Sequence, residues 1–213
     1  MITRIEIDGF KTFQNFTLDL GPFQVIVGAN GVGKSNLFDS LRLLARLADV
    51  DLRTAFQDLR GDAGELFTVR PDGSIATHMR LVVELLVDRQ VRDSWGAEEE
   101  LKYTRMRYHL EIERRDDDRG LERLYVVHES LKALPREQDQ WIKRFLDQRR
   151  EPWLPVLKRG RQEAFISTEL KGDTATISLH QDGHGGRKAS VAERVERTVL
   201  SGVSNTEFPH AFA

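Results

Sequence analysis

Apolar and polar positions alternate along several stretches of the chain, and this pattern predicts β-strands. Ile5 and Ile7 have charged neighbours and predict a first strand that ends near Gly9, while residues 16–20 predict a second. After the turn signal at residues 70–74, the period of two returns in longer segments. Their apolar positions are Met79, Leu81, Val83, Leu85 and Val87, then Met106, Tyr108, Leu110 and Ile112, and later Ala175, Ile177 and Leu179. Because the other face of each strand is polar, the pattern favours an antiparallel sheet with one solvated face.

Other stretches repeat apolar residues at the spacing of a helix. One covers residues 37–48, and a shorter one runs from 52 to 59. Pro135 suits the first turn of a third helix, which Pro152 ends. A capping box at residues 190–193 and the apolar residues behind it predict a helix over 190–202. We therefore expect an α/β fold.

The most informative motif lies between the first strands and the first helix. Residues 28–35 spell Gly-Ala-Asn-Gly-Val-Gly-Lys-Ser, which is a complete G-x-x-x-x-G-K-S phosphate-binding loop. The loop follows residues 23–27, which we predict to form a buried strand, and it precedes the helix at 37–48. A strand before and a helix after are the context that this motif requires, so the sequence predicts a P-loop.

Each residue type in this loop has a role in holding a triphosphate. Backbone N–H groups of a glycine-rich turn surround the phosphates, and the helix N-terminus adds a partial positive charge. Lys34 supplies a full charge at the β- and γ-phosphates, and the Ser35 hydroxyl is placed to ligate Mg²⁺. We predict a nucleoside triphosphate site with Ser35 as its metal ligand. The predicted binding residues are Gly28, Asn30, Gly31, Gly33, Lys34, Ser35 and Asn36.

Composition narrows the class of protein further. The chain has 213 residues, 39% of them hydrophobic and 31% charged, which is typical of a soluble globular protein. Its formal net charge of −2 gives no global attraction to nucleic acid, so any DNA contact must be local. The absence of cysteine excludes disulfides, cysteine-ligated zinc and thiol catalysis. No signal peptide and no membrane-spanning apolar run are present, and we expect a cytoplasmic protein.

Residues 2–48 resemble the RecF/SMC-like ATPases of the ABC superfamily, which include overcoming-lysogenization-defect-type and predicted AAA-type ATPases. The resemblance lies in Ile5-x-Ile7-x-Gly9-Phe10-Lys11-x-Phe13, in a short second strand, and in residues 25–37 with Asn36 directly after the loop serine. It implies a P-loop NTPase head with a mixed sheet, in which two heads sandwich ATP and Mg²⁺. It also implies a role in DNA repair, DNA maintenance or phage defence. Phe13 is then a candidate for stacking on adenine, with burial against the first strands as the alternative.

Several motifs of a complete head are not found, so the catalytic residues stay unknown. Residues 85–88 are the nearest match to a Walker B strand, but Glu84 interrupts the apolar run and Arg89 follows it. We interpret them as the end of an amphipathic strand. Leu200-Ser201-Gly202 superficially matches the ABC signature, yet we expect it to close the helix over 190–202, whereas a signature motif opens one.

Four further features leave alternatives open. The basic residues between 143 and 161 fit either a DNA-backbone contact or a solvated helix face. His180 and His184 fit either a metal pair or a glycine-rich turn. Asp58-x-x-Gly61 imitates a GTPase switch, and we interpret it as a helix end. The candidates for the Q-loop residue of the family are Gln57, Gln138, Gln162 and Gln181, and the sequence does not choose among them.

We predict that residues 1–213 form the amino-terminal part of one ATPase head. Residues 1–60 are its P-loop core, 75–181 are largely antiparallel strands with an inserted helix, and 190–202 form a helix. The chain then binds ATP but hydrolyses it poorly, because its partner is the missing carboxy-terminal half or a second head, as in a homodimer. The alternatives are a non-hydrolysing, nucleotide-dependent assembly module and a small-molecule P-loop kinase.

Overall fold

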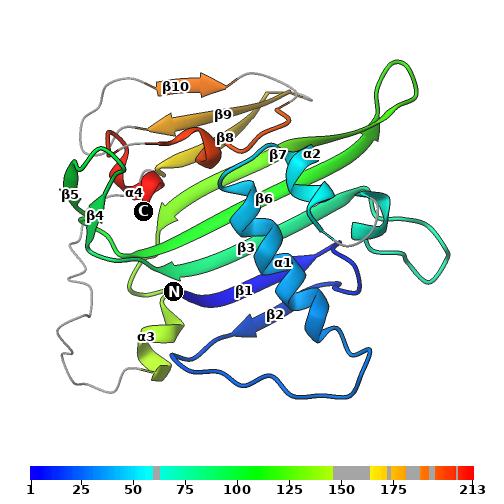
Figure 1. Ribbon diagram of the computed structural model, residues 1–213, viewed down its shortest axis with the longest axis horizontal. Helices are drawn as coiled ribbons and strands as arrows, with labels where there is room; N and C mark the ends of the chain where they lie inside the picture. Colours follow the sequence, from blue (N-terminus) through cyan, green and yellow to red (C-terminus); the bar gives the residue numbers. More distant parts are fainter. Residues whose placement is uncertain (60–62, 146–163, 172–173, 181–187, 192–194, 205) are drawn as a thin grey trace.

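The computed structural model describes residues 1–59, 63–145, 164–171, 174–180, 188–191, 195–204 and 206–213. Its main feature is an eight-stranded sheet with the order β10-β9-β8-β7-β6-β3-β1-β2, in which every neighbouring pair is antiparallel (Figure 1). The strands of this sheet are β1 (Ile2–Asp8), β2 (Phe16–Asp19), β3 (His78–Leu86), β6 (Arg105–Asp116), β7 (Glu122–Ala133), β8 (Ile166–Lys171), β9 (Thr174–His180) and β10 (Lys188–Val191). A separate hairpin pairs β4 (Gln90–Arg92) with β5 (Glu98–Glu100).

The helices are few and short, and the longest lies across one face of the sheet. This helix is α1 (Lys34–Leu47), and α2 (Leu52–Gln57) follows it on the same face (Figure 1). The remaining helical elements are η1 (Ala63–Leu66), α3 (Gln140–Phe145), η2 (Leu200–Gly202) and α4 (Pro209–Phe212). The helices at 37–48 and 52–59 are thus confirmed. The predicted helix after Pro135 is confirmed only in part: Pro135 lies in a turn, α3 begins at Gln140, and the predicted continuation beyond residue 145 lies outside the described residues.

The two faces of the sheet differ in polarity, as the alternation predicts. Ile5, Leu81 and Leu110 are fully buried in one apolar cluster with the inner residues of α1, such as Leu43. Side chains on the opposite face of β1, β3 and β6 are mainly charged and half-buried, including Arg4, Glu6, Arg80, Arg107 and Glu111. Burial of the apolar set on one side therefore fixes the register of the strands. The α/β class with a large antiparallel sheet is confirmed.

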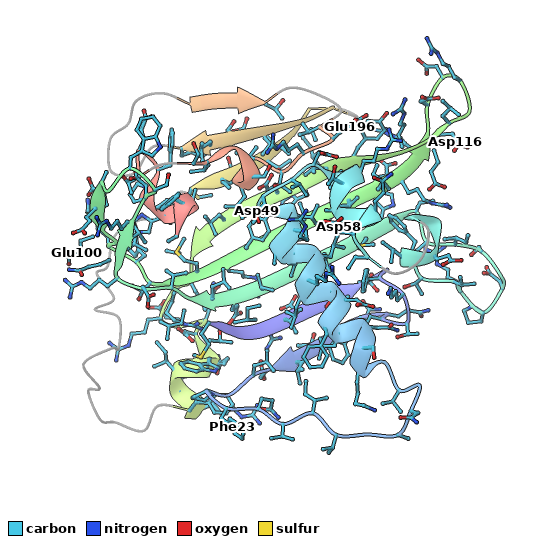
Figure 2. The ribbon with its side chains drawn as sticks, in the orientation of Figure 1. Phe23, Asp49, Asp58, Glu100, Asp116 and Glu196 are labelled. Atoms are coloured by element: carbon cyan, nitrogen blue, oxygen red, sulfur yellow. The ribbon has the colours of Figure 1, made fainter. Side chains whose placement is uncertain are left out.

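The prediction of a buried strand at residues 23–27 is wrong. The segment is not part of any described strand, and the side chains of Phe23, Val25 and Val27 are 85%, 61% and 84% exposed. Phe23 lies at the periphery of the molecule (Figure 2). β1 is hydrogen-bonded to β2 on one side and to β3 on the other, so residues 23–27 cannot pair with β1. The apolar composition of residues 23–27 predicts a strand, but these residues could be buried only if a partner strand lay beside them.

The prediction of a helix over 190–202 is also wrong. Residues 188–191 form β10, which pairs with β9, and only Leu200–Gly202 turns into a short 3₁₀-helix. Val195 forms an isolated bridge with Val126 of β7. Tertiary pairing with the sheet therefore overrides the local helix signal of the capping box, as it commonly does for short segments.

Candidate nucleotide-binding site

The phosphate-binding loop ends in a backbone arrangement that suits an anion. Gly33 caps α1 in the left-handed conformation, with φ near 95°, and Gly31 is also left-handed, with φ near 87°. Both conformations favour glycine. No side chain caps the N-terminus of α1, a helix of 14 residues, and no acidic residue lies in its first turn. The first N–H groups of the helix therefore stay available to a phosphate.

The charged residue of the loop folds over the loop itself. The Nζ atom of Lys34 donates hydrogen bonds to the carbonyl oxygens of Gly28 (2.6 Å) and Ala29 (2.7 Å). These two carbonyls hold the ammonium group over its own loop. Ser35 is exposed, as a metal ligand beside a phosphate must be. Asn36, by contrast, donates from Nδ2 to Oγ1 of Thr12 (2.9 Å) and so faces the β1–β2 connection.

The connection between β1 and β2 supports the loop from the side. Gly9 begins it with φ near 73°, where a Cβ would collide with the backbone of His78, so a glycine is required. Thr12 lies against Gly33, and Lys11 forms an ion pair with Asp39 of α1 (2.6 Å). The residues Gly9, Lys11 and Thr12 therefore fix the start of α1. The Gly-Phe-Lys motif gave a signal for this connection, but the role of Thr12 was not predicted.

Phe13 takes the structural role that we gave as the alternative. Its side chain is buried, belongs to the apolar core and lies 4.5 Å from the ring of Phe16, measured between centroids. A ring packed in this way has no free face on which a base can stack. The structure therefore favours burial over adenine stacking for Phe13.

The nearest match to a Walker B strand does not reach the phosphate-binding loop. Leu85 and Leu86 end β3, which is antiparallel to both neighbours, and this end of β3 lies across the sheet from the start of α1 (Figure 1). Asp88 lines a separate surface pocket with Arg89, Gln90 and Glu100. The carboxylate of Glu84 accepts a hydrogen bond from Arg107 (2.9 Å), and burial raises its pKa. These residues fit the interpretation of a strand end.

Leu200-Ser201-Gly202 opens a turn that a carboxylate of the same chain already occupies. The backbone N–H groups of Val199 and Leu200 donate to the carboxylate of Glu129, at 2.6 and 3.0 Å. The Tyr108 hydroxyl donates to the same carboxylate (3.1 Å). Burial raises the pKa of Glu129, whereas the hydrogen bonds from these donors act in the opposite direction. The motif does not close a helix as predicted, yet its N–H groups are not free for a nucleotide.

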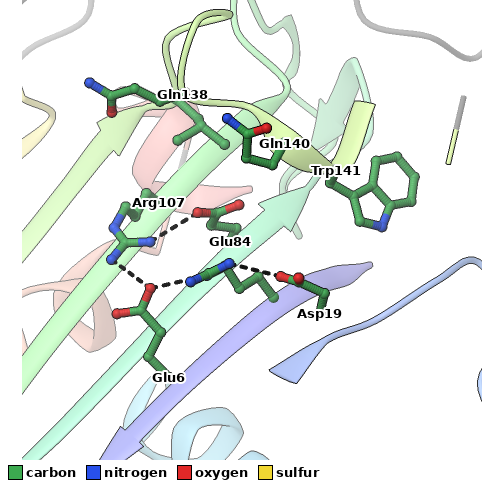
Figure 3. Close-up of a pocket in the computed structure, with 9 residues that line it drawn as sticks. Glu6, Asp19, Glu84, Arg107, Gln138, Gln140 and Trp141 are labelled. Atoms are coloured by element: carbon green, nitrogen blue, oxygen red, sulfur yellow. Dashed lines mark hydrogen bonds and ion pairs between the residues drawn. The ribbon is translucent and has the colours of Figure 1, made fainter. Parts of the chain in front are cut away.

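A polar cavity of about 250 Å³ lies on the charged face of the sheet (Figure 3). Its ionic groups satisfy one another. Glu6 accepts hydrogen bonds from Arg4 (3.1 Å) and Arg107 (2.9 Å), and Arg4 donates to Asp19 (2.9 Å). Ion pairing with these arginines lowers the pKa of Glu6 against the opposing effect of burial. Because these charges are already paired with one another, we interpret this cavity as part of the ionic network of the sheet.

The other candidate residues stay apart from the phosphate-binding loop or outside the described residues. Asp58 pairs with Arg46 at the end of α2, which confirms a helix end. The Nε2 atom of His180 is hydrogen-bonded to the hydroxyl of Ser167 (2.7 Å), while His184 lies outside the described residues. Among the described residues, no group of side chains that could hold a metal ion is found. Of the Q-loop candidates, Gln57 ends α2 and Gln138 lines the polar cavity, while Gln162 and Gln181 lie outside the described residues. Most of the basic segment 143–161 also lies outside them.

Comparison with known proteins supports the interpretation of the amino-terminal region as part of an ATPase domain. Residues 1–76, which include β1, β2, the phosphate-binding loop and α1, match the family profile described as AAA ATPase domain. A search of curated proteins finds no match. The chain is similar to a solved structure described by the words "ATP-driven dimerization and DNA stimulated activation of SMC ATPases", at 20% identity over 67% of this chain and 75% of that chain, with a TM-score of 0.35. None of the helices in the described part of the chain is long and apolar enough to cross a membrane.

Proposed function

We propose that this chain is the ATP-binding part of an ABC/SMC-like ATPase. The observation that carries the proposal is the loop 28–35, where two left-handed glycines open an uncapped α1 and Lys34 is held over the turn. The match of residues 1–76 to the AAA ATPase domain supports it. In this proposal Gly28, Asn30, Gly31, Gly33 and Lys34 surround the phosphates, with Asn36 orienting the loop. The Ser35 hydroxyl ligates Mg²⁺.

We further propose that hydrolysis requires a Walker B and signature half supplied from outside the described residues. The first turn of α1 has no acidic residue, and the carboxylate of Asp39, further along the helix, is paired with Lys11. The chain then binds ATP with little turnover by itself. In a complete cytoplasmic protein, hydrolysis would accompany contact with DNA in repair, maintenance or phage defence, as the resemblance of residues 2–48 implies. A non-hydrolysing assembly module remains the second candidate, and it rests on the same missing carboxylates.

The first prediction tests nucleotide binding. We expect titration calorimetry to detect binding of Mg·ATP to the wild-type chain, and we expect Lys34→Ala to weaken it about 10- to 100-fold, because a charged hydrogen-bonding group is lost. Lys102→Ala removes an exposed lysine elsewhere and serves as the matched control. Equal affinity in all three chains, or no heat with the wild type, would contradict the proposed site.

The second prediction concerns the partner. We propose that the exposed apolar residues Phe23, Val25 and Val27 bury against the missing half or a second copy of the chain. The isolated chain should therefore self-associate, and Val27→Lys should weaken this association about 100-fold, since each of the two copies loses a buried valine. Sedimentation equilibrium measures the effect. Leu170→Lys, at another exposed apolar position, is the control that should leave self-association unchanged.

A further inference from the structure

Among the described residues, backbone–backbone hydrogen bonds hold the chain that leads into the phosphate-binding loop only at its two ends. Between the ends, Ile26 packs against the apolar core, and Lys34 bonds the carbonyls of Gly28 and Ala29. Among the described residues, no backbone–backbone hydrogen bond begins or ends in residues 22–32. Downstream, the loop joins α1 at Gly33, whose carbonyl accepts from the N–H of Leu37 (3.0 Å). Upstream, the last held residue is Leu20, whose N–H donates to the carbonyl of Thr3 (2.8 Å). Apart from the contacts of Ile26 and Lys34, the position of the loop therefore depends on how firmly Leu20 is fixed.

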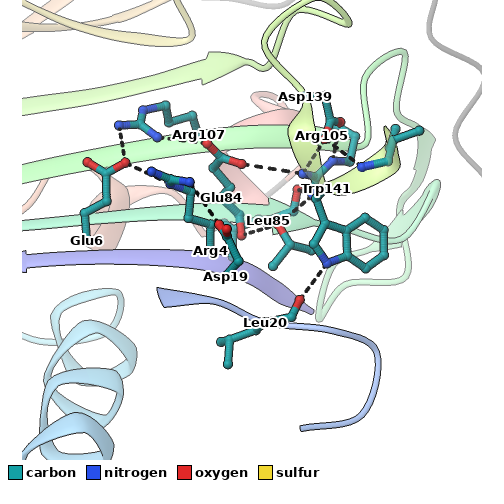
Figure 4. A network of polar contacts seen from close by, with 12 residues as sticks. Arg4, Glu6, Asp19, Leu20, Glu84, Leu85, Arg105, Arg107, Asp139 and Trp141 are labelled. Carbon is teal, nitrogen blue, oxygen red and sulfur yellow. Dashed lines mark hydrogen bonds and ion pairs between the residues drawn. The ribbon is translucent and has the colours of Figure 1, made fainter. Parts of the chain in front are cut away.

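The carbonyl of Leu20 is fixed by a tryptophan. The indole Nε1–H of Trp141 donates to this oxygen at 2.6 Å, and the Trp141 side chain is buried (Figure 4). This contact joins residues far apart in the sequence, and it lies directly before the unpaired segment. A strong hydrogen bond at this point determines where the segment starts.

Two more residues of α3 hold the neighbours of Leu20. The guanidinium of Arg144 pairs with the carboxylate of Asp19 (3.3 Å), and the Phe145 ring packs against the backbone of Gly21. Residues 141, 144 and 145 have the spacing of one helix face, so α3 presents a single surface to residues 19–21. We call this surface, formed by Trp141, Arg144 and Phe145, the bracket, because it holds the start of the segment in place.

The bracket is itself fixed to the centre of the sheet. Asp139 accepts from the N–H of Ile142 in α3 (3.2 Å) and binds the guanidinium of Arg105 with both oxygens, at 2.7 and 3.0 Å. The same guanidinium lies over the Trp141 ring, 5.3 Å from its centroid (Figure 4). Because Arg105 is fully buried at the start of β6, Trp141 has little freedom to move.

We propose that Trp141 is a positioning residue for the nucleotide, acting through Leu20 on the segment that carries the phosphate-binding loop. The inference rests on the proposed function, since it concerns affinity for a triphosphate. A carbonyl released at Leu20 lets residues 22–28 sample more conformations, and the loop then meets the phosphates in its binding geometry less often. The apparent affinity falls in proportion to the competent fraction.

The test replaces Trp141 by phenylalanine, which keeps an aromatic side chain but removes the N–H donor together with part of the ring. Binding of a fluorescent ATP analogue with Mg²⁺ should weaken about fivefold, as the loss of one hydrogen bond implies. Trp95→Phe is the matched control, because the Trp95 side chain is 92% exposed, and it should bind as the wild type does. Thermal unfolding of each variant is measured in parallel. A lower unfolding temperature with unchanged affinity would show a purely structural role and overturn the proposal.

A second measurement covers the case in which Trp141→Phe does not fold. In the Trp95→Phe/Trp153→Phe chain, Trp141 is the only tryptophan. Its selectively excited emission should therefore change with Mg·ATP if the contact with Leu20 responds to the nucleotide. Unchanged emission at saturating nucleotide would overturn the proposal. If the wild type binds, Lys34→Ala does not and Trp141→Phe binds normally, only this inference fails. If the wild type binds no nucleotide, the proposed function fails with it.

Discussion

Replacing Glu129 by alanine is expected to lower the free energy of unfolding by about 3–6 kcal/mol, because buried donors lose their acceptor. Glu129 is fully buried on β7, and its carboxylate accepts from the N–H groups of Val199 and Leu200 and from the Tyr108 hydroxyl. Each donor left without a partner costs about 1–3 kcal/mol. Urea denaturation followed by circular dichroism measures the loss.

Glu129→Gln separates the acceptor role from simple packing. An amide has almost the same shape, but one of its two polar atoms is a donor and must then face a donor of Val199, Leu200 or Tyr108. We therefore expect a cost of about 1–3 kcal/mol, smaller than for alanine but clear. Burial raises the pKa of this carboxyl, so the desolvation cost that glutamine avoids offsets part of the loss. A glutamine variant as stable as the wild type would show that the carboxylate is not needed.

The position of Glu129 shows why some features could not be predicted. The pairing of β6 with β7 skips a residue between Val126 and His128, so the bulge turns Glu129 towards the core together with Leu131. A strict period of two assigns Glu129 and Val126 to opposite faces. Bulges leave no signal in the apolar pattern, and a buried carboxylate is then mistaken for a solvated one.

The elements that could be predicted are those whose burial depends on their own sequence pattern. β3 and β6 alternate between a core face and a charged face, and α1 has an apolar stripe along its full length, so their patterns suffice. Residues 23–27 and 190–202 depend on which strand lies beside them. The phosphate-binding loop could be predicted from its motif, and the motif also implies the left-handed conformations of its glycines. The contacts of Thr12 and Trp141 could not be predicted, because these residues lie in distant parts of the chain.

Replacing Arg105 by methionine is expected to lower the free energy of unfolding by about 3–5 kcal/mol, since the buried carboxylate of Asp139 is left without its cation. Arg105 makes two bonds to Asp139 and two more to Thr3 Oγ1 (2.8 Å) and the Leu85 carbonyl (3.0 Å). These contacts tie β1, β3 and β6 to α3. The same change should also weaken ATP binding, because the bracket that holds Leu20 loses its anchor.

A double-mutant cycle with Asp139→Leu measures the pair itself. The double variant should be less destabilised than the sum of the two single changes, because removing both charges leaves neither one buried alone. The exposed pair of Arg46 and Asp58 provides the contrast: Arg46→Met should cost less than about 1 kcal/mol, since water screens that pair. If Arg105→Met cost no more than Arg46→Met, the network beneath α3 would not hold the helix in place. Trp141 would then have no fixed support from which to position the phosphate-binding loop.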